Sequence, residues 1–227
     1  MLGEIISQIN HFIQVVITYA PRFLPGVKMT LQLSFFSILL GTVFGLVATM
    51  LKMTKIKPLM KTIDIYISIV RGTPLLLQLI FIFQALPEVG IRFSPFISAV
   101  IGLAFHNGAY ISEIFRGAIE SIDSGQKEAA RSLGMTKWQA MRRVTLPQAF
   151  KRSVPALGNQ FIIAIKDSSL ASVITITEIL MLTRQYTAAT FNPWPMFFIA
   201  GCYYMIITIG LSKALLRVEK RLKVYER

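Results

Sequence analysis

The chain has 227 residues, of which 54% are hydrophobic and only 15% charged, and its mean hydropathy is +0.59. Soluble domains usually carry about 25% charged residues, so this composition excludes an ordinary water-soluble enzyme and indicates an integral membrane protein. The net charge of +13 does not indicate nucleic-acid binding, because the cations lie mostly in short stretches between apolar runs. A single cysteine, Cys202, allows no intrachain disulfide, and we expect no metal centre.

The N-terminal segment 1–28 is predicted to lie in the membrane interface. Residues 5–20 are too few and too polar for a span, yet their apolar side chains fall on one face of a helix. Pro21 is expected to end this amphipathic helix. Residues 1–20 contain no Lys or Arg, so we expect no cleaved signal peptide.

Apolar stretches of roughly 20 residues predict five membrane-spanning helices within a transmembrane domain at 29–216. The fourth span is polar, so it must be shielded inside a bundle or line a wet cavity. Gly41 and Gly45 on the first span form a small-xxx-small pair, which is typical of close helix packing. The fold class is therefore an all-α integral membrane protein. The expected spans are about 29–51, 60–86, 95–115, 155–176 and 194–216.

The distribution of Lys and Arg predicts the orientation. The segments after spans one, three and five carry four, eight and six cations, which makes 18 on one side of the membrane. The other side carries four, namely Arg22, Lys28, Arg92 and Arg184. By the positive-inside rule the 18 are cytoplasmic. The N-terminus is then outside, and the basic tail 217–227 is inside.

The longest connection, the cytoplasmic loop 116–154, is patterned for two short helices. Residues 126–133 favour a first helix that Gly134 can close as a C-cap. Thr136 and Gln139 have the spacing of a capping box for a second helix, which Pro147 is expected to end or kink. Two short helices in a basic loop indicate a docking element.

Glu128-Ala129-Ala130 is followed after three residues by Gly134, after nine more by Val144, and after one more by Leu146-Pro147. This spacing resembles the EAA loop of ABC importer permeases, with Val144 standing where that family usually has isoleucine. The resemblance implies that the loop is a coupling helix seated in a groove of a cytoplasmic ATPase subunit. The alternative is a surface helix without a particular partner. The matching positions, which are the expected ATPase-coupling residues, are Glu128, Ala129, Ala130, Gly134, Leu146 and Pro147.

Span two carries a charge and a helix break near the middle of the membrane. Arg71 is expected roughly 16 Å from the cytoplasmic surface, where a charge needs a partner, water or a ligand. Gly72 and Pro74 interrupt the helix, and Thr73 is expected to cap a new half-helix that runs outward. The positive end of that half-helix beside Arg71 predicts a carboxylate site. The alternative is a proline kink with Arg71 tied to a neighbouring helix.

Two other polar groups are expected at a similar depth. Lys166 on span four and Asn107 on span three lie roughly 16 and 18 Å from a membrane surface. Lys166 and Asp167 point about 100° apart on a helix, so one can contact substrate while the other locks the bundle. A purely structural ion-pair role for both is the alternative. Asn107 is preferred over its neighbour His106. The candidate substrate-binding residues are Arg71, Gly72, Thr73, Asn107, Lys166 and Asp167.

Residues 69–76, 166–170 and 30–34 resemble the polar amino-acid subfamily of these permeases, and the resemblance covers roughly 25–220. It implies a five-helix type I ABC importer transmembrane domain in a bacterial cytoplasmic membrane, preceded by an N-terminal amphipathic helix. The expected partners are two copies of the ATPase, a second permease subunit that is identical or related, an external amino-acid-binding protein and the lipid bilayer.

The resemblance implies a transport function without catalysis on this chain. No G-x-x-x-x-G-K-[ST] phosphate loop is present in the sequence, so ATP and Mg²⁺ are expected on the partner ATPase, with no cofactor here. Three alternatives stay open: a permease for another small solute, an ATP-independent secondary transporter, and a membrane-embedded enzyme. The last has little support, because the sequence lacks an H-E-x-x-H motif and a Cys/His cluster.

Overall fold

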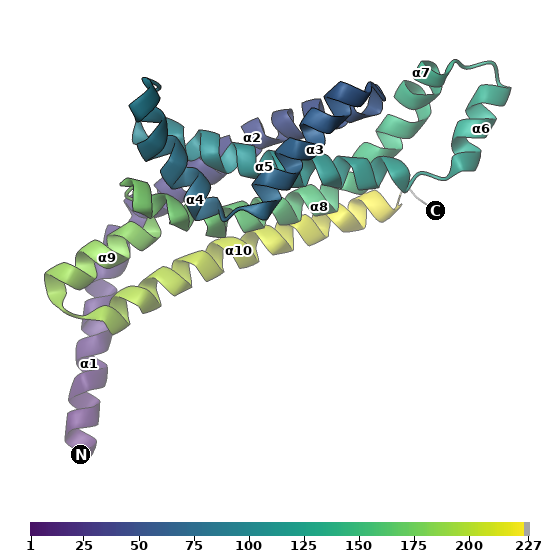
Figure 1. Ribbon diagram of the computed structural model, residues 1–227. Helices are drawn as coiled ribbons and strands as arrows, with labels where there is room; N and C mark the ends of the chain where they lie inside the picture. Colours follow the sequence, from purple (N-terminus) through teal and green to yellow (C-terminus); the bar gives the residue numbers. More distant parts are fainter. Residues whose placement is uncertain (225–227) are drawn as a thin grey trace.

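The computed structural model describes residues 1–224, and the regular elements in that range are all helical. Four long helices run lengthwise through the molecule (Figure 1). The helix α5 is central, because α2 packs along it and α8 packs against it, while α10 lies on α8. The four long helices are α2 (Leu24–Met53), α5 (Pro95–Glu120), α8 (Leu146–Asp167) and α10 (Pro193–Val224).

Glycines allow the close approach of α2 to α5. A Cβ atom at Gly41 would lie 3.0 Å from the carbonyl oxygen of Ala104, and one at Gly45 would lie 2.6 Å from Cγ2 of Ile111. The packing role expected for Gly41 and Gly45 is thus confirmed. Beside this contact, Thr49 of α2 donates from its hydroxyl to the carbonyl of Ser112 at 3.1 Å.

Helix α1 (Leu2–Tyr19) stands away from the bundle at the end where α9 lies (Figure 1). A 3₁₀ turn, η1 (Ala20–Phe23), joins α1 to α2, and Pro21 lies in its first positions, where no N–H is needed. Helix α2 begins at Leu24 and so starts within the segment 1–28 that was expected to precede the first span. The α1 side chains that pack inward meet α10, as in the edge-to-face contact of Phe12 and Phe198 at 5.3 Å.

The second predicted span is a broken helix. The axis bends by 108° between helix α3 (Lys57–Gly72) and the segment Leu75–Val89. The outer segment consists of α4 (Leu75–Ile80), the π turn η2 (Phe81–Ala85) and the 3₁₀ turn η3 (Leu86–Val89). The break at Gly72–Pro74 thus turns the chain sharply rather than kinking it slightly.

By length and hydropathy alone, the described chain has two helical stretches fit to cross a membrane. They are Gly3–Met53 and Pro193–Leu222, and the bent pair of α3 and α4 would be a third. Helices α5 and α8 fall short of that test. Both bury polar side chains such as Asn107 and Gln160 inside the bundle, where they need not be apolar on every face.

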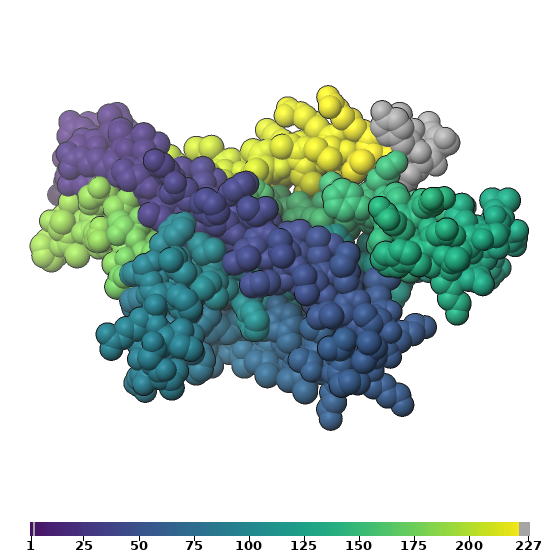
Figure 2. Space-filling model, turned by 90° about the horizontal axis from the view of Figure 1, so that it is seen from above, coloured from purple at the N-terminus to yellow at the C-terminus, as the bar shows by residue number. Residues whose placement is uncertain are grey.

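The loop 116–154 forms a separate lobe at the end opposite α1 (Figures 1 and 2). Helix α6 (Ser124–Ser132) is followed by α7 (Lys137–Ala140) and by a π turn, η4 (Met141–Thr145), that leads into α8. The capping box of Thr136 and Gln139 is confirmed. Pro147 does not end the helical run, because it lies in the first turn of α8, directly after the π turn that interrupts the regular helix.

Two further differences lie near the end of the chain. Predicted span four changes at Ser168 from α8 to the 3₁₀ helix η5 (Ser168–Ile174). Helix α9 (Ile179–Thr190) lies in a segment for which no helix was predicted. Helix α10 continues to Val224, so it includes most of the expected basic tail. Residues 225–227 of that tail lie outside the described residues.

Candidate functional site

Arg71 lies in the last turn of α3, directly before the break, and its side chain is exposed. The guanidinium carbon lies 5.4 Å from the centre of the Tyr110 ring on α5, a cation–π contact. No carboxylate lies within ion-pairing distance of Arg71 in the part of the chain that the structure describes. The guanidinium donors are therefore open to a ligand.

Gln78, which was not among the predicted site residues, satisfies the backbone groups that the break leaves without a hydrogen bond. Pro74 has no N–H for the carbonyl of Val70, and Nε2 of Gln78 donates to that oxygen at 2.9 Å instead. The same amide nitrogen donates to the carbonyl and hydroxyl oxygens of Thr73, at 3.1 and 3.0 Å. A lone Gln four residues after a proline in an apolar half-helix is the signal that could have revealed this role.

The capping role expected for Thr73 is wrong. Pro74 occupies the N-cap position of α4 with an extended backbone, and no side chain caps that helix. The Thr73 hydroxyl turns back to donate to the carbonyl of Ile69 at 2.8 Å. This i−4 bond competes with capping, as is common for threonine at the end of a helix.

Aromatic and amide groups extend the cluster around Arg71 onto α5. Oε1 of Gln78 lies 3.2 Å from Nδ1 of His106, and the His106 ring lies 5.1 Å from the Tyr110 ring. Arg71, Tyr110, His106 and Gln78 thus form one connected group at the junction of α3, α4 and α5. Helical spacing could have indicated the pair on α5, because His106 and Tyr110 are four residues apart.

Asn107 is fully buried and does not reach the surface around Arg71. Its Nδ2 donates to the carbonyl of Leu103 at 2.7 Å, and its Oδ1 accepts from Nε2 of Gln160 at 2.7 Å. The second bond joins α5 to α8 across the bundle. In this arrangement Asn107 braces two helices, because both of its polar atoms are already satisfied within the protein.

Lys166 and Asp167 are the last two residues of α8. The Lys166 side chain is exposed and that of Asp167 is half-buried, and neither forms a salt bridge in the described residues. The helix η5 that follows them packs against α4 through a shared apolar cluster that includes Leu79 and Ile174. The chain thereby brings the end of α8 next to the half-helix that follows Arg71.

The predicted coupling residues occupy the projecting lobe. Glu128 and Ala129 are exposed on α6, whereas Ala130 is buried. Gly134 has a φ of +83° and ends α6, since its N–H donates to the carbonyl of Arg131 and the Met135 N–H donates to that of Ala130. This pair of bonds is a Schellman motif, so the expected C-cap is confirmed.

Other coupling positions lie where the lobe joins the bundle, and two apolar side chains extend its surface. Leu146 is half-buried and Pro147 is exposed at the start of α8. Leu133 and Trp138, which were not among the predicted coupling residues, are 80% and 65% exposed on either side of Gly134. Large apolar side chains so open to water indicate a contact surface.

Glu178 is a buried carboxylate that the sequence analysis misses. It caps α9 by accepting from the N–H groups of Leu180 and Met181 at 2.8 and 2.7 Å, and the Tyr204 hydroxyl donates to it at 2.8 Å. Burial raises the pKa of the Glu178 carboxyl above its ordinary value of 4.5, although these hydrogen bonds act in the opposite direction. The position just before the apolar start of α9 is the signal for this cap.

Comparison with known proteins places the chain in one family. The family described as "Binding-protein-dependent transport system inner membrane component" matches residues 21–224. The glutamine transport system permease protein GlnP of Escherichia coli (strain K12) is 38% identical over 206 residues, which cover 90% of this chain and 94% of that protein. The L-cystine transport system permease protein TcyB of Bacillus subtilis (strain 168) is 38% identical, with 92% and 89% covered.

Solved structures agree with this assignment. The crystal structure of an amino acid ABC transporter with histidines superposes with a TM-score of 0.88 at 39% identity, covering 92% of this chain and 97% of that one. The MetNI methionine ABC transporter shares the fold, with a TM-score of 0.75 at 23% identity and 88% and 95% covered. This chain therefore belongs to the family of binding-protein-dependent transport system inner membrane components.

Proposed function

We propose that the chain is the permease subunit of an ATP-driven importer that moves a polar amino acid across the bacterial cytoplasmic membrane. The observation that carries the proposal is Arg71, an exposed guanidinium at the break between α3 and α4 that has no carboxylate partner in the described residues. The matched relatives are named for glutamine and L-cystine transport, which supports an amino-acid substrate. A permease for another small solute is the second candidate.

In the proposed substrate site, Arg71 binds the α-carboxylate, and the backbone at Gly72 and Thr73 leaves room for it beside the start of α4. The placement of Lys166 and Asp167 before η5, which packs on α4, supports a contact of one of them with another part of the same ligand. Asn107 takes part indirectly by holding α5 against α8 through Gln160. Gln78 and Tyr110 position Arg71 and the break.

The lobe of α6 and α7 is the proposed contact with a cytoplasmic ATPase, of which two copies serve the complex. The exposed Ala129 permits close approach to a groove, and the exposed Glu128 can pair with basic residues of that groove, while the buried Ala130 packs α6 within the lobe. ATP and Mg²⁺ bind to that partner, and this chain supplies no catalytic residue.

The exposure of two cations supports a second permease subunit, identical or related. Arg71 and Lys166 are exposed on a single subunit at depths where lipid would not tolerate them, so another subunit must shield them and leave a wet path between the two.

The basic α2–α3 turn, the lobe and the end of α10 gather at one end of the molecule, which supports a cytoplasmic C-terminus and an external N-terminus (Figure 1). An external binding protein then delivers the amino acid.

The test is uptake in proteoliposomes that contain the permease, its ATPase and its external binding protein. We expect uptake of a radiolabelled polar amino acid only when ATP is hydrolysed, and none with a non-hydrolysable analogue. Uptake driven by an ion gradient without ATP would instead establish a secondary transporter. ATP-dependent uptake of a solute without an α-carboxylate would favour the second candidate.

A further inference from the structure

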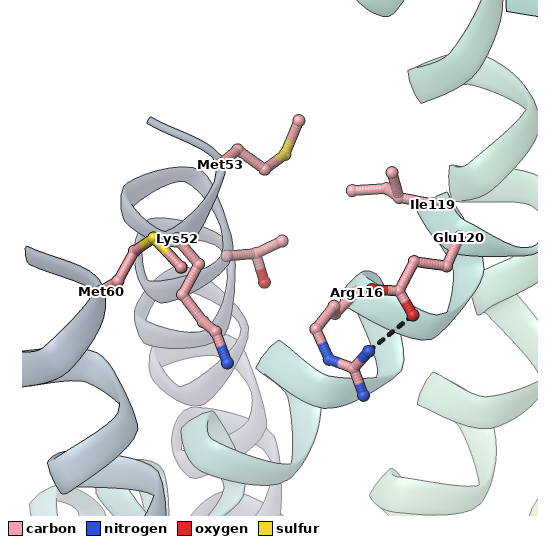
Figure 3. A pocket seen from close by; sticks show the side chains of 7 residues that line it. Lys52, Met53, Met60, Arg116, Ile119 and Glu120 are labelled. Carbon is pink, nitrogen blue, oxygen red and sulfur yellow. Dashed lines mark hydrogen bonds and ion pairs between the residues drawn. The ribbon is translucent and has the colours of Figure 1, made fainter. Parts of the chain in front are cut away.

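A cleft lies at the cytoplasmic ends of α2, α3 and α5, away from the Arg71 cluster. It consists of two adjoining hollows of about 220 and 180 Å³ that share Thr49, Met53 and Ile119 in their walls. Figure 3 shows the charged hollow, with Lys52 and Met60 on one side and Arg116 and Glu120 on the other. The two hollows differ in chemistry, because one has three charged side chains in its otherwise apolar walls and the other has none.

The charged hollow is bordered by a chain of ion pairs. Nζ of Lys52 lies 2.8 Å from Asp64 on α3 and 3.6 Å from Glu113 on α5. Arg116 pairs with Glu113 at 2.7 Å and with Glu120 at 2.6 Å. Three carboxylates thus face two cations, and the cluster as a whole carries one negative charge.

These ion pairs leave some hydrogen-bond donors and one hydrogen-bond acceptor of the cluster unused. Arg116 has five N–H donors and uses three of them, on Glu113 and Glu120. Lys52 has three donors for its two carboxylate neighbours. In the described residues, Oε1 of Glu120 accepts no hydrogen bond. The cluster therefore has an unused acceptor beside the unused donors of Arg116.

The second hollow continues the cleft as an apolar groove. Met50 and Phe150 on its walls are 57% and 59% exposed. The other apolar side chains along it are Leu46, Phe115, Leu146 and Ala149. A ligand that fills both hollows must have a small polar end of mixed charge and an apolar tail.

We propose that this cleft binds one phospholipid of the cytoplasmic leaflet whose headgroup carries an amine beside its phosphate. The phosphate accepts from Lys52 and Arg116, the ammonium donates to Glu120, and an acyl chain lies along Met50, Met53 and Phe150. The cleft lies at the end of the molecule that carries the basic loop, at the level of the lipid headgroups. The unused Oε1 of Glu120 favours a headgroup with an ammonium over one without it, such as phosphatidylglycerol.

A second surface hollow offers an internal comparison. It is larger, about 500 Å³, and lies between α2 and α5 at Leu39, Val43 and Val100, with an entirely apolar lining. Such a surface can take any acyl chain but offers nothing to select a headgroup. Selection of an amine headgroup should therefore occur at the cleft and not at this hollow.

The experiment is native mass spectrometry of the purified permease complex, released from nanodiscs of equal phosphatidylethanolamine and phosphatidylglycerol. We expect phosphatidylethanolamine to be retained selectively. Glu120→Gln should lower the retained ratio of the two lipids roughly tenfold, the equivalent of one lost charge-assisted hydrogen bond. Ile119→Trp fills the groove and should remove the retained lipid, whereas the matched Leu39→Trp should leave the ratio unchanged.

The other outcomes overturn the proposal. Retention of phosphatidylglycerol, or equal retention of both lipids, would show that the charged cluster does not select the headgroup. An equal effect of Leu39→Trp and Ile119→Trp would show a general lipid annulus. Loss of lipid only when a variant complex no longer assembles would also count against it, so size-exclusion chromatography of each variant accompanies the measurement.

Discussion

At the scale of single residues, the environment of Arg71 differs from that of Lys52 and Arg116, the two cations of the cleft. Lys52 and Arg116 are held by carboxylates, whereas Arg71 has only the face of Tyr110 in the described residues. A cation–π contact at an exposed site contributes about 0.5–1 kcal/mol, which orients a guanidinium without using its N–H donors. Arg71 is thus held in place and still able to bind an anion.

We predict that Arg71→Ala weakens binding of the amino acid in the membrane site by roughly one to two orders of magnitude, because one charge-assisted contact worth about 1.5–3 kcal/mol is lost. The KM for transport by the reconstituted complex, at saturating binding protein, measures this. Arg71→Lys should retain only part of the affinity for the amino acid, because lysine lacks the planar fork of donors. A well-assembled Arg71→Ala complex with the parent rate and KM would refute the role.

Tyr110→Phe is the matched control for the neighbouring ring. Phenylalanine keeps the aromatic face under the guanidinium, so transport should stay close to that of the parent. Tyr110→Leu removes the face and should raise KM by about two- to fivefold, in line with the modest energy of an exposed cation–π contact. Equal effects of the two variants would assign the role to the Tyr110 hydroxyl instead.

Glu178 gives a prediction about pH. Burial raises the pKa of its carboxyl above 4.5, so the folded protein binds this proton more readily than the unfolded chain. The contribution to stability is full below pH 4.5 and is lost as pH rises through the higher folded value. Glu178→Gln removes this titration, so the Tm of the parent minus that of the variant should fall as the pH rises above 4.5. A difference independent of pH would contradict the prediction.

At the scale of elements, the turn between α6 and α7 depends on a backbone conformation that favours glycine. At φ of +83° a β-branched residue is strained by about 1–2 kcal/mol or more, although no atom would collide with its Cβ. Gly134→Val should therefore distort the turn and lower co-purification of the ATPase several-fold without unfolding the bundle. Asparagine tolerates this conformation, so Gly134→Asn should retain most of the ATPase co-purification. Normal ATPase binding by Gly134→Val would exclude a role for the turn.

The contact of α2 with α5 gives a second prediction at this scale. A Cβ at Gly45 would meet both the Ile111 side chain and the backbone nitrogen of Ser112, at 2.6 and 3.0 Å, so one helix must shift. Gly45→Ala should cost about 1–3 kcal/mol and lower the Tm in detergent. Gly117→Ala on α5 has open space and should be neutral or slightly stabilising. An unchanged Tm for Gly45→Ala would contradict the tight packing.

At the scale of the whole molecule, the distribution of charge agrees with the arrangement of the elements in space. Three basic segments far apart in sequence lie at the same end of the molecule, together with the lobe of α6 and α7 (Figure 1). The opposite end holds α1 and α9, and α1 carries neither Lys nor Arg. One orientation therefore satisfies all of the segments together.

The orientation is tested by labelling in intact cells, in a Cys202→Ser background. Arg184 on α9 is exposed, so Arg184→Cys should react with a membrane-impermeant thiol reagent from outside. Leu133→Cys in the lobe should react only after the cells are opened. A C-terminal tag should likewise resist external protease. The opposite labelling pattern would invert the proposed topology.

Much of the architecture follows from local sequence, because local rules act over a few residues. Gly134, the Thr136–Gln139 capping box, the helix break at Gly72–Pro74 and the small pair on α2 all work through backbone conformation, missing donors or side-chain size. Such properties belong to the residue itself, and the sequence predicts them without knowledge of its neighbours.

What only the tertiary structure decides is which groups meet across helices. Asn107 and Arg71 are both polar residues in apolar spans, but Gln160 satisfies the first, while the second faces an aromatic ring and open space. Gln78 replaces the donor that Pro74 lacks, and Glu178 closes α9 against α10 through Tyr204. The energy of a polar side chain in a membrane protein depends on the partner it meets. That partner is set by long-range packing, which no local pattern encodes.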